Sequence, residues 1–174
     1  MKMRLTYGEV FALANAGMLS VSARTLPARD RYNVFDLKQR LRDALKSREE
    51  REKELIKECG IEDAAAFDAR NEELRKKETL TEDERKELDG NRAKLETYLG
   101  QRTELNKDSV EMDVRPIGYE AWFALRDENA RVKVGEEERD LISDWAEAML
   151  FGKFWTAPAD ADSADNGKPS EATE

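Results

Sequence analysis

The side chains that most often carry out catalysis or bind metals are scarce in this sequence. Histidine is absent, which removes the commonest metal ligand and the usual general base. Cys59 is the single cysteine, so no disulfide can form within the chain. Carboxylates are plentiful but form no recognisable catalytic or metal-binding motif. We therefore predict a non-enzymatic protein with no catalytic residue, no cofactor and no metal; an enzyme that uses carboxylates is the alternative.

Three consecutive acidic residues lie near the C-terminal end of the expected domain. Glu136, Glu137 and Glu138 stand at the expected start of a helix that continues through Trp145 to Leu150. Negative charge in the first turn complements the helix dipole, whereas a metal site needs ligands that converge from several segments. We interpret the three acids as a helix start.

The composition points to helices with large solvent-exposed surfaces. Apolar residues make up 39% of the 174 residues, charged residues make up 40%, and the formal net charge is −9. This acidity disfavours nucleic-acid binding, which needs a concentrated basic surface. No apolar run approaches the length of about 18 residues that a membrane span needs, and the N-terminus does not have the charged-then-apolar pattern of a signal segment, so we expect a cytosolic protein. A nucleic-acid binder would need one face formed by Arg24, Arg29, Arg31, Lys38, Arg40 and Arg42.

The clearest structural pattern is a long helix over residues 26–60. Pro27 suits its first turn and Gly60 suits the position just past its end. Between them the chain has some thirty residues without a helix breaker. An apolar stripe at steps of three and four consists of Val34, Leu37, Leu41, Leu45, Leu55 or Ile56, and Cys59.

A second long helix is predicted over residues 81–106. Thr81 and Glu84 have the capping-box spacing at its start. Leu88, Leu95 and Leu99 form a narrow leucine stripe, which indicates either packing within the chain or a coiled-coil contact with a second copy. We expect residues 27–106 to form a long antiparallel, coiled-coil-like helical hairpin, with a weaker helix over residues 61–77, and we assign the three leucines to self-association.

Residues 1–26 and 107–155 are expected to form the base of this hairpin in a single mainly α domain over residues 1–155. A capping box of Thr6 and Glu9 begins a short helix, which we expect to dock on Tyr32 and Phe35. Alternation over residues 110–114 predicts a minor β element. Its pairing partner can be residues 3–5, 19–23 or 131–134, or another copy. A further short helix is expected over residues 119–129, and residues 156–174 read as a disordered acidic tail.

The end of the expected domain is unusually aromatic. Phe151, Phe154 and Trp155 either close the core near the hairpin base or form a patch that docks a partner protein. As candidate partner-binding residues we name all three.

The order of these parts resembles that of small uncharacterised proteins encoded by tailed bacteriophages and prophages. The resemblance rests on residues 5–13 (LTYGEVFAL), on Leu26 and Pro27 before a long charged helix that ends near Cys59 and Gly60, and on residues 110–114 followed by a proline. It covers residues 5–125 in outline. The helix over residues 61–77 and the aromatic C-terminal segment depart from the shorter members.

The resemblance implies a phage origin and carries no established activity. The expected function is that of a non-enzymatic accessory or structural protein acting through protein–protein interaction, as a virion component or an assembly factor. Its partner would be a phage structural protein or a host factor, and a homo-oligomer stays open. The expected location is the cytoplasm of the bacterial host or the virion. The alternative function is an inhibitor of a host defence protein, which would bind a basic cleft.

Overall fold

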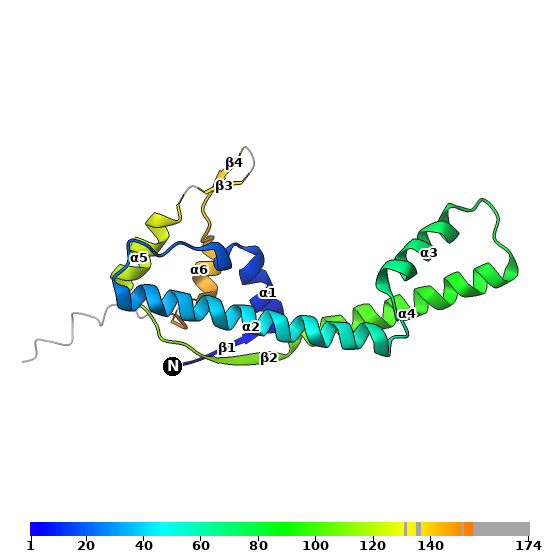
Figure 1. Cartoon of the computed structure of the whole chain (residues 1–174), viewed down its shortest axis with the longest axis horizontal. Helices are drawn as coiled ribbons and strands as arrows, with labels where there is room; N and C mark the ends of the chain where they lie inside the picture. The colour runs from blue at the N-terminus through cyan, green and yellow to red at the C-terminus, as the bar shows by residue number, and fades with distance from the viewer. Residues whose placement is uncertain (131, 135–136, 151, 155–174) are drawn as a thin grey trace, which may run out of the picture. The chain divides into compact units, whose positions relative to one another are not determined.

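The computed structural model describes residues 1–130, 132–134, 137–150 and 152–154. In chain order the elements are β1 (Lys2–Thr6), α1 (Tyr7–Asn15), η1 (Met18–Ser20), α2 (Ala28–Glu58), α3 (Ala64–Lys76), α4 (Glu82–Lys107), β2 (Ser109–Asp113), α5 (Tyr119–Glu128), β3 (Val132–Val134), β4 (Glu137–Arg139) and α6 (Asp144–Leu150). The protein is mainly helical, as predicted (Figure 1). The predicted tail over residues 156–174 lies outside the described residues.

The chain divides into two compact units. The first contains residue 1, residues 20–37 and residues from 114 onward; the second contains residues 2–19 and 38–113. The division passes through α2 and separates the two segments that were expected to form one base, so each unit is described by itself.

The second unit contains the sheet that the sequence predicted only in part. Strand β2 pairs antiparallel with β1, and Met3 lies opposite Met112. This is the first of the four pairing partners that the alternation left open. Met3, Leu5 and Met112 are buried on one face of the sheet, which explains why apolar residues occupy alternate positions. Residues 19–23, the second option, begin instead with the short 3₁₀ helix η1.

Helix α1 begins where β1 ends. Thr6 Oγ1 accepts a hydrogen bond from the Glu9 backbone N–H, while Glu9 accepts one from the Thr6 N–H, so the predicted capping box is confirmed. Tyr7 N–H donates to the carbonyl of Asp108, just beyond α4. A Cβ on Gly8 would come within 3.1 Å of the Asn106 carbonyl oxygen. Glycine at this position therefore permits the close approach of α1 to the end of α4.

The two long helices have nearly the predicted bounds. Helix α2 ends before Gly60, whose φ of 73° is the left-handed conformation that stops helices. Val34, Leu37, Leu41 and Ala44 form its buried stripe. Helix α4 begins with the predicted capping box of Thr81 and Glu84.

Helix α3 folds back along α4 in the second unit (Figure 1). Its Leu74 is fully buried. Arg70 Nε and Nη2 bind both carboxylate oxygens of Glu87 at 2.9 and 2.8 Å. Asn91 Nδ2 donates to Asn71 Oδ1 at 2.9 Å. One buried leucine and several polar pairs thus attach this short helix.

In the first unit α5 and α6 pack through both apolar and ionic contacts. Trp122 of α5 is buried, and its indole N–H donates to Glu147 of α6 at 3.3 Å. The guanidinium of Arg126 lies 2.7 Å from the same carboxylate. Ile117 N–H donates to the carbonyl of Phe154 at 3.0 Å, which holds the segment after α6 against the segment before α5.

The helix expected to start at Glu136 begins later. Glu137 and Glu138 belong to β4, which pairs antiparallel with β3, and Glu136 lies outside the described residues. Helix α6 begins at Asp144, where Ser143 Oγ accepts from the Ala146 N–H at 3.2 Å. The prediction was wrong because Ser143 caps the helix start, while two of the acids that we placed in its first turn belong to strand β4.

The end of α5 fastens the loop that precedes α2. The Glu128 carboxylate accepts hydrogen bonds from the Ser22 hydroxyl, from the Thr25 hydroxyl at 2.6 Å, and from the backbone N–H groups of Arg24 and Thr25 at 2.8 and 2.9 Å. The side chain of buried Asn129 pairs with the backbone N–H and carbonyl of Ser22, each at 2.7 Å. Burial raises the pKa of Glu128, but these donors outweigh it and lower the pKa to about 2.

We predict that Glu128 makes the first unit sensitive to acid. Its folded pKa of about 2 lies below the ordinary value of 4.5, so its carboxylate stabilises the fold above pH 4.5 and loses this contribution as the pH falls towards 2. Glu128→Gln should lower the free energy of unfolding at neutral pH and flatten its pH dependence between these values. Urea unfolding at several pH values measures both. Glu120→Gln, at an exposed position of the same helix, is the control and should behave like the wild type.

Candidate interaction surfaces

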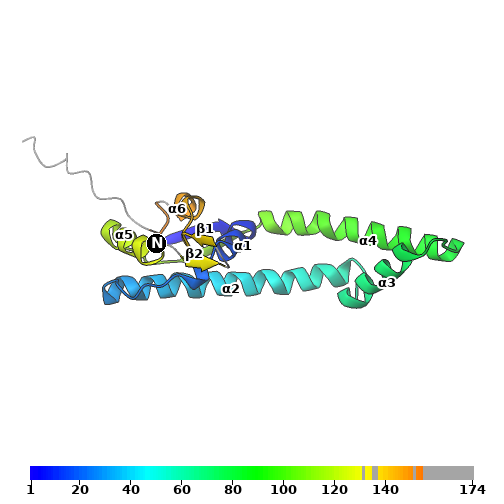
Figure 2. The same cartoon turned by 90° about the horizontal axis from the view of Figure 1, so that it is seen from above.

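In the second unit, polar and charged side chains join the C-terminal half of α2 to α4. Arg48 is buried; its Nε donates to Asn106 Oδ1 at 3.1 Å and its Nη1 to Glu52 at 2.8 Å. Glu52 also accepts from the Tyr98 hydroxyl at 2.7 Å, and the Arg102 Nε lies 2.7 Å from the same carboxylate. Because higher numbers on α2 meet lower numbers on α4, the two helices run in opposite directions here, side by side in Figures 1 and 2.

The charges of this network shift the pKa values of its members. Burial opposes ionisation of Glu52, but the Tyr98 hydroxyl and the Arg48 and Arg102 guanidiniums outweigh it and lower its pKa. For Tyr98, burial and the hydrogen bond to the Glu52 carboxylate raise the pKa. The network therefore consists of an ionised carboxylate between two cations and a neutral phenol. Its role is structural, because each of these groups already binds another side chain of the network.

Beside this network lies an open groove of about 650 Å³, which we call the α2–α4 groove. Leu55 of α2 and buried Leu105 at the end of α4 supply its apolar surface. Thr97 and Gly100 of α4 leave the groove open on that side, because threonine has a small side chain and glycine has none. The charged residues that line the groove are Arg51, Glu54, Glu58, Glu96, Glu104 and Asp108.

The residues predicted to mediate self-association lie together on a different surface. Leu88, Leu95 and Leu99 of α4 line a second groove of about 370 Å³, whose other wall includes Asn71 and Arg75 of α3. Leu88 and Leu95 are half-buried, and Leu99 remains 47% exposed. We call this the leucine surface. Packing within the chain covers it only in part.

The structure corrects the assignment of Phe154. Its side chain is fully buried, within the first unit, so it cannot contact a partner and instead closes the core, the alternative that the sequence left open. Phe151 and Trp155 lie outside the described residues. Phe154 lies beyond the end of α6 at Leu150, so helical spacing gave no signal of its burial.

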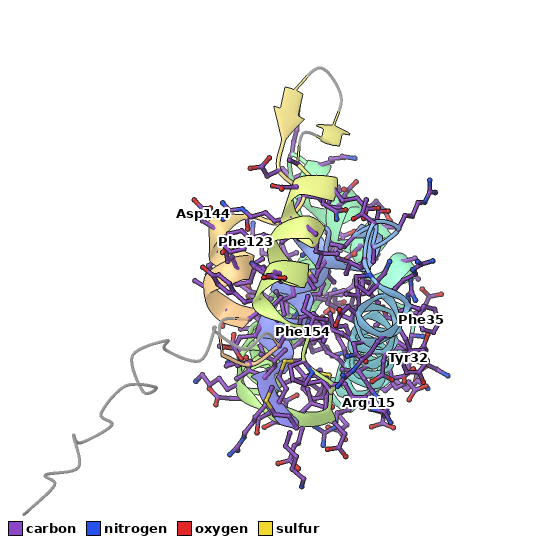
Figure 3. The ribbon with its side chains drawn as sticks, turned by 90° about the vertical axis from the view of Figure 1, so that its left-hand side faces the viewer. Tyr32, Phe35, Arg115, Phe123, Asp144 and Phe154 are labelled. Carbon is purple, nitrogen blue, oxygen red and sulfur yellow. The ribbon has the colours of Figure 1, made fainter. Side chains whose placement is uncertain are left out.

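Exposed aromatic residues that we did not assign to binding occur elsewhere in the first unit. Tyr32 and Phe35 are 57% and 58% exposed, so the expected docking surface for the first helix is wrong; α2 buries Val34 and Leu37 instead. Figure 3 shows Tyr32, Phe35 and Arg115 on one side of this unit. A depression of about 510 Å³ there is lined by Met1, Arg29, Tyr32, Asn33, Arg115 and Pro116.

A second exposed pair lies on α5. The rings of Tyr119 and Phe123 meet edge to face with centroids 4.6 Å apart, and both side chains remain partly exposed. Trp145 of α6 is exposed as well. Nothing in the sequence distinguishes exposed Tyr119 and Phe123 from buried Trp122, because all three aromatic residues lie within the same short helix.

The described residues show neither a metal site nor a membrane span. Among the described residues, no group of three or more carboxylates or cysteines is arranged to hold a metal ion. In that same part of the chain, no helix is long and apolar enough to span a membrane. No family model, no curated protein and no solved structure matches the chain.

We predict that the buried pair of Arg48 and Glu52 stabilises the second unit only when both partners are present. Glu52→Ala leaves the buried Arg48 without its counter-charge and should lower the free energy of unfolding by about 3 kcal/mol. Replacing both partners, with Arg48→Met and Glu52→Leu together, removes the buried charge pair and leaves only Arg102, which is 39% exposed, so it should cost much less. Urea denaturation compares the variants. A double variant as unstable as Glu52→Ala would contradict this account.

Proposed function

We propose that this protein is a non-enzymatic interaction protein whose α2–α4 helical hairpin self-associates through the leucine surface. The observation that supports the proposal is the position of Leu88, Leu95 and Leu99, which line an open groove rather than the contact between α2 and α4. That contact is made by polar groups instead. The leucine stripe is therefore available to a second molecule.

The charges around the leucine surface suit a second copy of the same chain. The lining residues include two cations, Arg75 and Arg92, and two anions, Asp89 and Glu96. A two-fold contact brings one patch against itself, so the patch must be complementary to its own copy. An apolar stripe flanked by equal numbers of opposite charges meets this condition, as the flanking positions of coiled coils do.

The resemblance to phage and prophage proteins supports a more specific assignment, as a phage-encoded accessory or structural protein. Self-association is compatible with the role of a virion component or an assembly factor. Under this assignment the protein acts in the cytoplasm of the bacterial host or in the virion.

One observation favours a second candidate function, the inhibition of a host defence protein. The α2–α4 groove is lined by five carboxylates and one arginine, a surface that can bind the basic cleft of such a protein. Binding of that kind would weaken steeply as salt is raised. Recovery of partners from infected cells with the tagged protein, at low and moderate salt, separates the two functions. Virion proteins retained at moderate salt support the first; a host nuclease or sensor lost as salt rises supports the second.

Self-association is tested by charged substitutions on two sides of α4. Leu99→Asp and Leu95→Asp should convert an oligomer into a monomer, because each places a carboxylate in an apolar contact. Ala93→Asp introduces the same side chain at an exposed position roughly opposite Leu95 on the helix and should leave the mass unchanged. Light scattering after size-exclusion chromatography measures the mass.

Leu99→Asp is the sharper of the two variants because Leu99 is already about half exposed. We expect its free energy of unfolding as a monomer to change by less than about 1 kcal/mol, as for most surface substitutions. A wild-type protein that stays monomeric at about 100 μM, well above the micromolar range in which specific contacts of modest strength form, would overturn the proposed self-association.

A further inference from the structure

We infer that the α2–α4 groove binds a helix of a partner protein, one that carries lysine or arginine along both edges of a narrow apolar stripe. This inference does not depend on the self-association proposed above, because it concerns the other groove of α4, which shares only Glu96 with the leucine surface. It deepens the second candidate function, which uses the same acidic groove, by giving the chemistry of the partner. It rests on the shape of the groove, on its apolar floor and on the order of the charges along its two walls.

The shape of the groove matches a helix. Its lining residues run along one face from Glu96 of α4 to Asp108, just past the end of the helix, which at 1.5 Å per residue spans about 18 Å. On α2 the lining residues Arg51, Glu54, Leu55 and Glu58 follow the same helical spacing. A Cβ at Gly100 would meet nothing within 4 Å, so the space above this residue is open. A groove between two helices that is open at Gly100 can bind a third helix packed along them.

The floor of the groove supplies an apolar contact of limited width. Leu55 and Leu105 face it from the two helices, and Thr97 and Gly100 add little bulk. A partner with a narrow apolar stripe can cover this floor. A broad apolar surface would instead bury the carboxylates of the walls without partners, which is costly.

The walls define the charge of the partner. Arg51 is already paired, since its Nη1 lies 3.1 Å from the Asp108 carboxylate. Glu54 and Glu58 form no ion pair with any residue that the structure describes. Within the described part of the chain, Glu96 and Glu104 pair only with Arg92 and Lys107 of their own exposed helix surface, and such pairs are weak enough for another cation to replace. Carboxylates therefore flank the floor on both sides.

The spacing of these carboxylates also favours an ordered partner. Glu54 and Glu58 are one helical turn apart on α2, and Glu96 and Glu104 are two turns apart on α4. Basic residues repeated at three and four positions on a helix present charges at the same intervals. Nucleic acid is excluded as the occupant because its phosphates would face the acidic walls.

The test uses a labelled synthetic helix of about 18 residues, with leucines at helical spacing flanked by lysines. Fluorescence anisotropy measures its binding to the full chain. Gly100→Trp should weaken binding about tenfold or more, because the indole fills the groove at its centre. Gly90→Trp is the matched control: Gly90 lies in the same helix, is equally open and does not line the groove, so its affinity should stay within about twofold.

Two further arms test the charges. Replacing Glu54 and Glu104 together by glutamine should weaken binding and reduce its salt dependence. A peptide with glutamates in place of the lysines should not bind. Equal affinity of the Gly100→Trp variant and the wild type, binding of the glutamate peptide, or no binding of the lysine peptide to the wild type would each overturn the inference.

The mass of each variant distinguishes this inference from the proposed self-association. Gly100→Trp should keep the oligomeric state of the wild type and lose the peptide, whereas Leu99→Asp should do the reverse. If Gly100→Trp instead abolishes self-association, the occupant of the groove is a second copy and the inference of a basic partner helix is wrong.

Discussion

The buried guanidinium of Arg48 is the group on which the second unit depends. A charged group that leaves water must be paired and hydrogen-bonded, or its desolvation outweighs the contacts that it makes. Arg48 meets this condition through Glu52 on its own helix, Asn106 on α4 and the face of the Phe11 ring on α1, which lies 4.7 Å from the guanidinium carbon. Because these partners belong to three helices, one side chain fixes α1, α2 and α4 within this unit.

The polar contact between α2 and α4 leaves the leucines of α4 partly exposed. If leucines had made that contact, the apolar stripe of α4 would be buried between the two helices. The helices instead meet through Glu52, Tyr98 and Arg102. Leu88, Leu95 and Leu99 of α4 line the groove beside the short helix α3, and packing within the chain covers them only in part. Directional hydrogen bonds therefore give the contact between α2 and α4 its specificity. The apolar area of the leucine surface stays available for association.

Local signals in the sequence were sufficient for most of the helices and for one strand. Capping boxes at Thr6 and Thr81, the glycine after α2 and the alternation around Met112 each act through neighbours in the chain, so they predicted α1, α4, the end of α2 and β2 correctly. The pairing of β2 with β1 joins residues more than a hundred positions apart, and several segments offered similar alternation. Helix α6 was misplaced because acids at a helix start and acids in a strand look alike when nothing shows what they face.

The candidate surfaces were harder to predict than the fold, for a related reason. Whether Phe154 or Trp145 is exposed depends on which neighbours cover it, and periodicity over a segment as short as α6 does not decide this. The leucine stripe of α4 is long enough to be recognised, yet its spacing does not tell packing within the chain from packing against a copy. The α2–α4 groove was not predictable at all, because it forms from carboxylates on two helices whose relative register is set by Arg48 and Glu52.

The charges on the two sides of α4 suit the leucine surface and the α2–α4 groove to different partners. At 3.6 residues per turn, Leu95 and Leu99 point to one side of the helix, while Thr97, Gly100 and Glu104 point to roughly the other. The leucine side carries balanced charges and is compatible with its own copy. The groove side carries an excess of carboxylates, so two copies brought together by that side would repel each other. One helix therefore directs self-association to one side and leaves the other side for a partner of opposite charge.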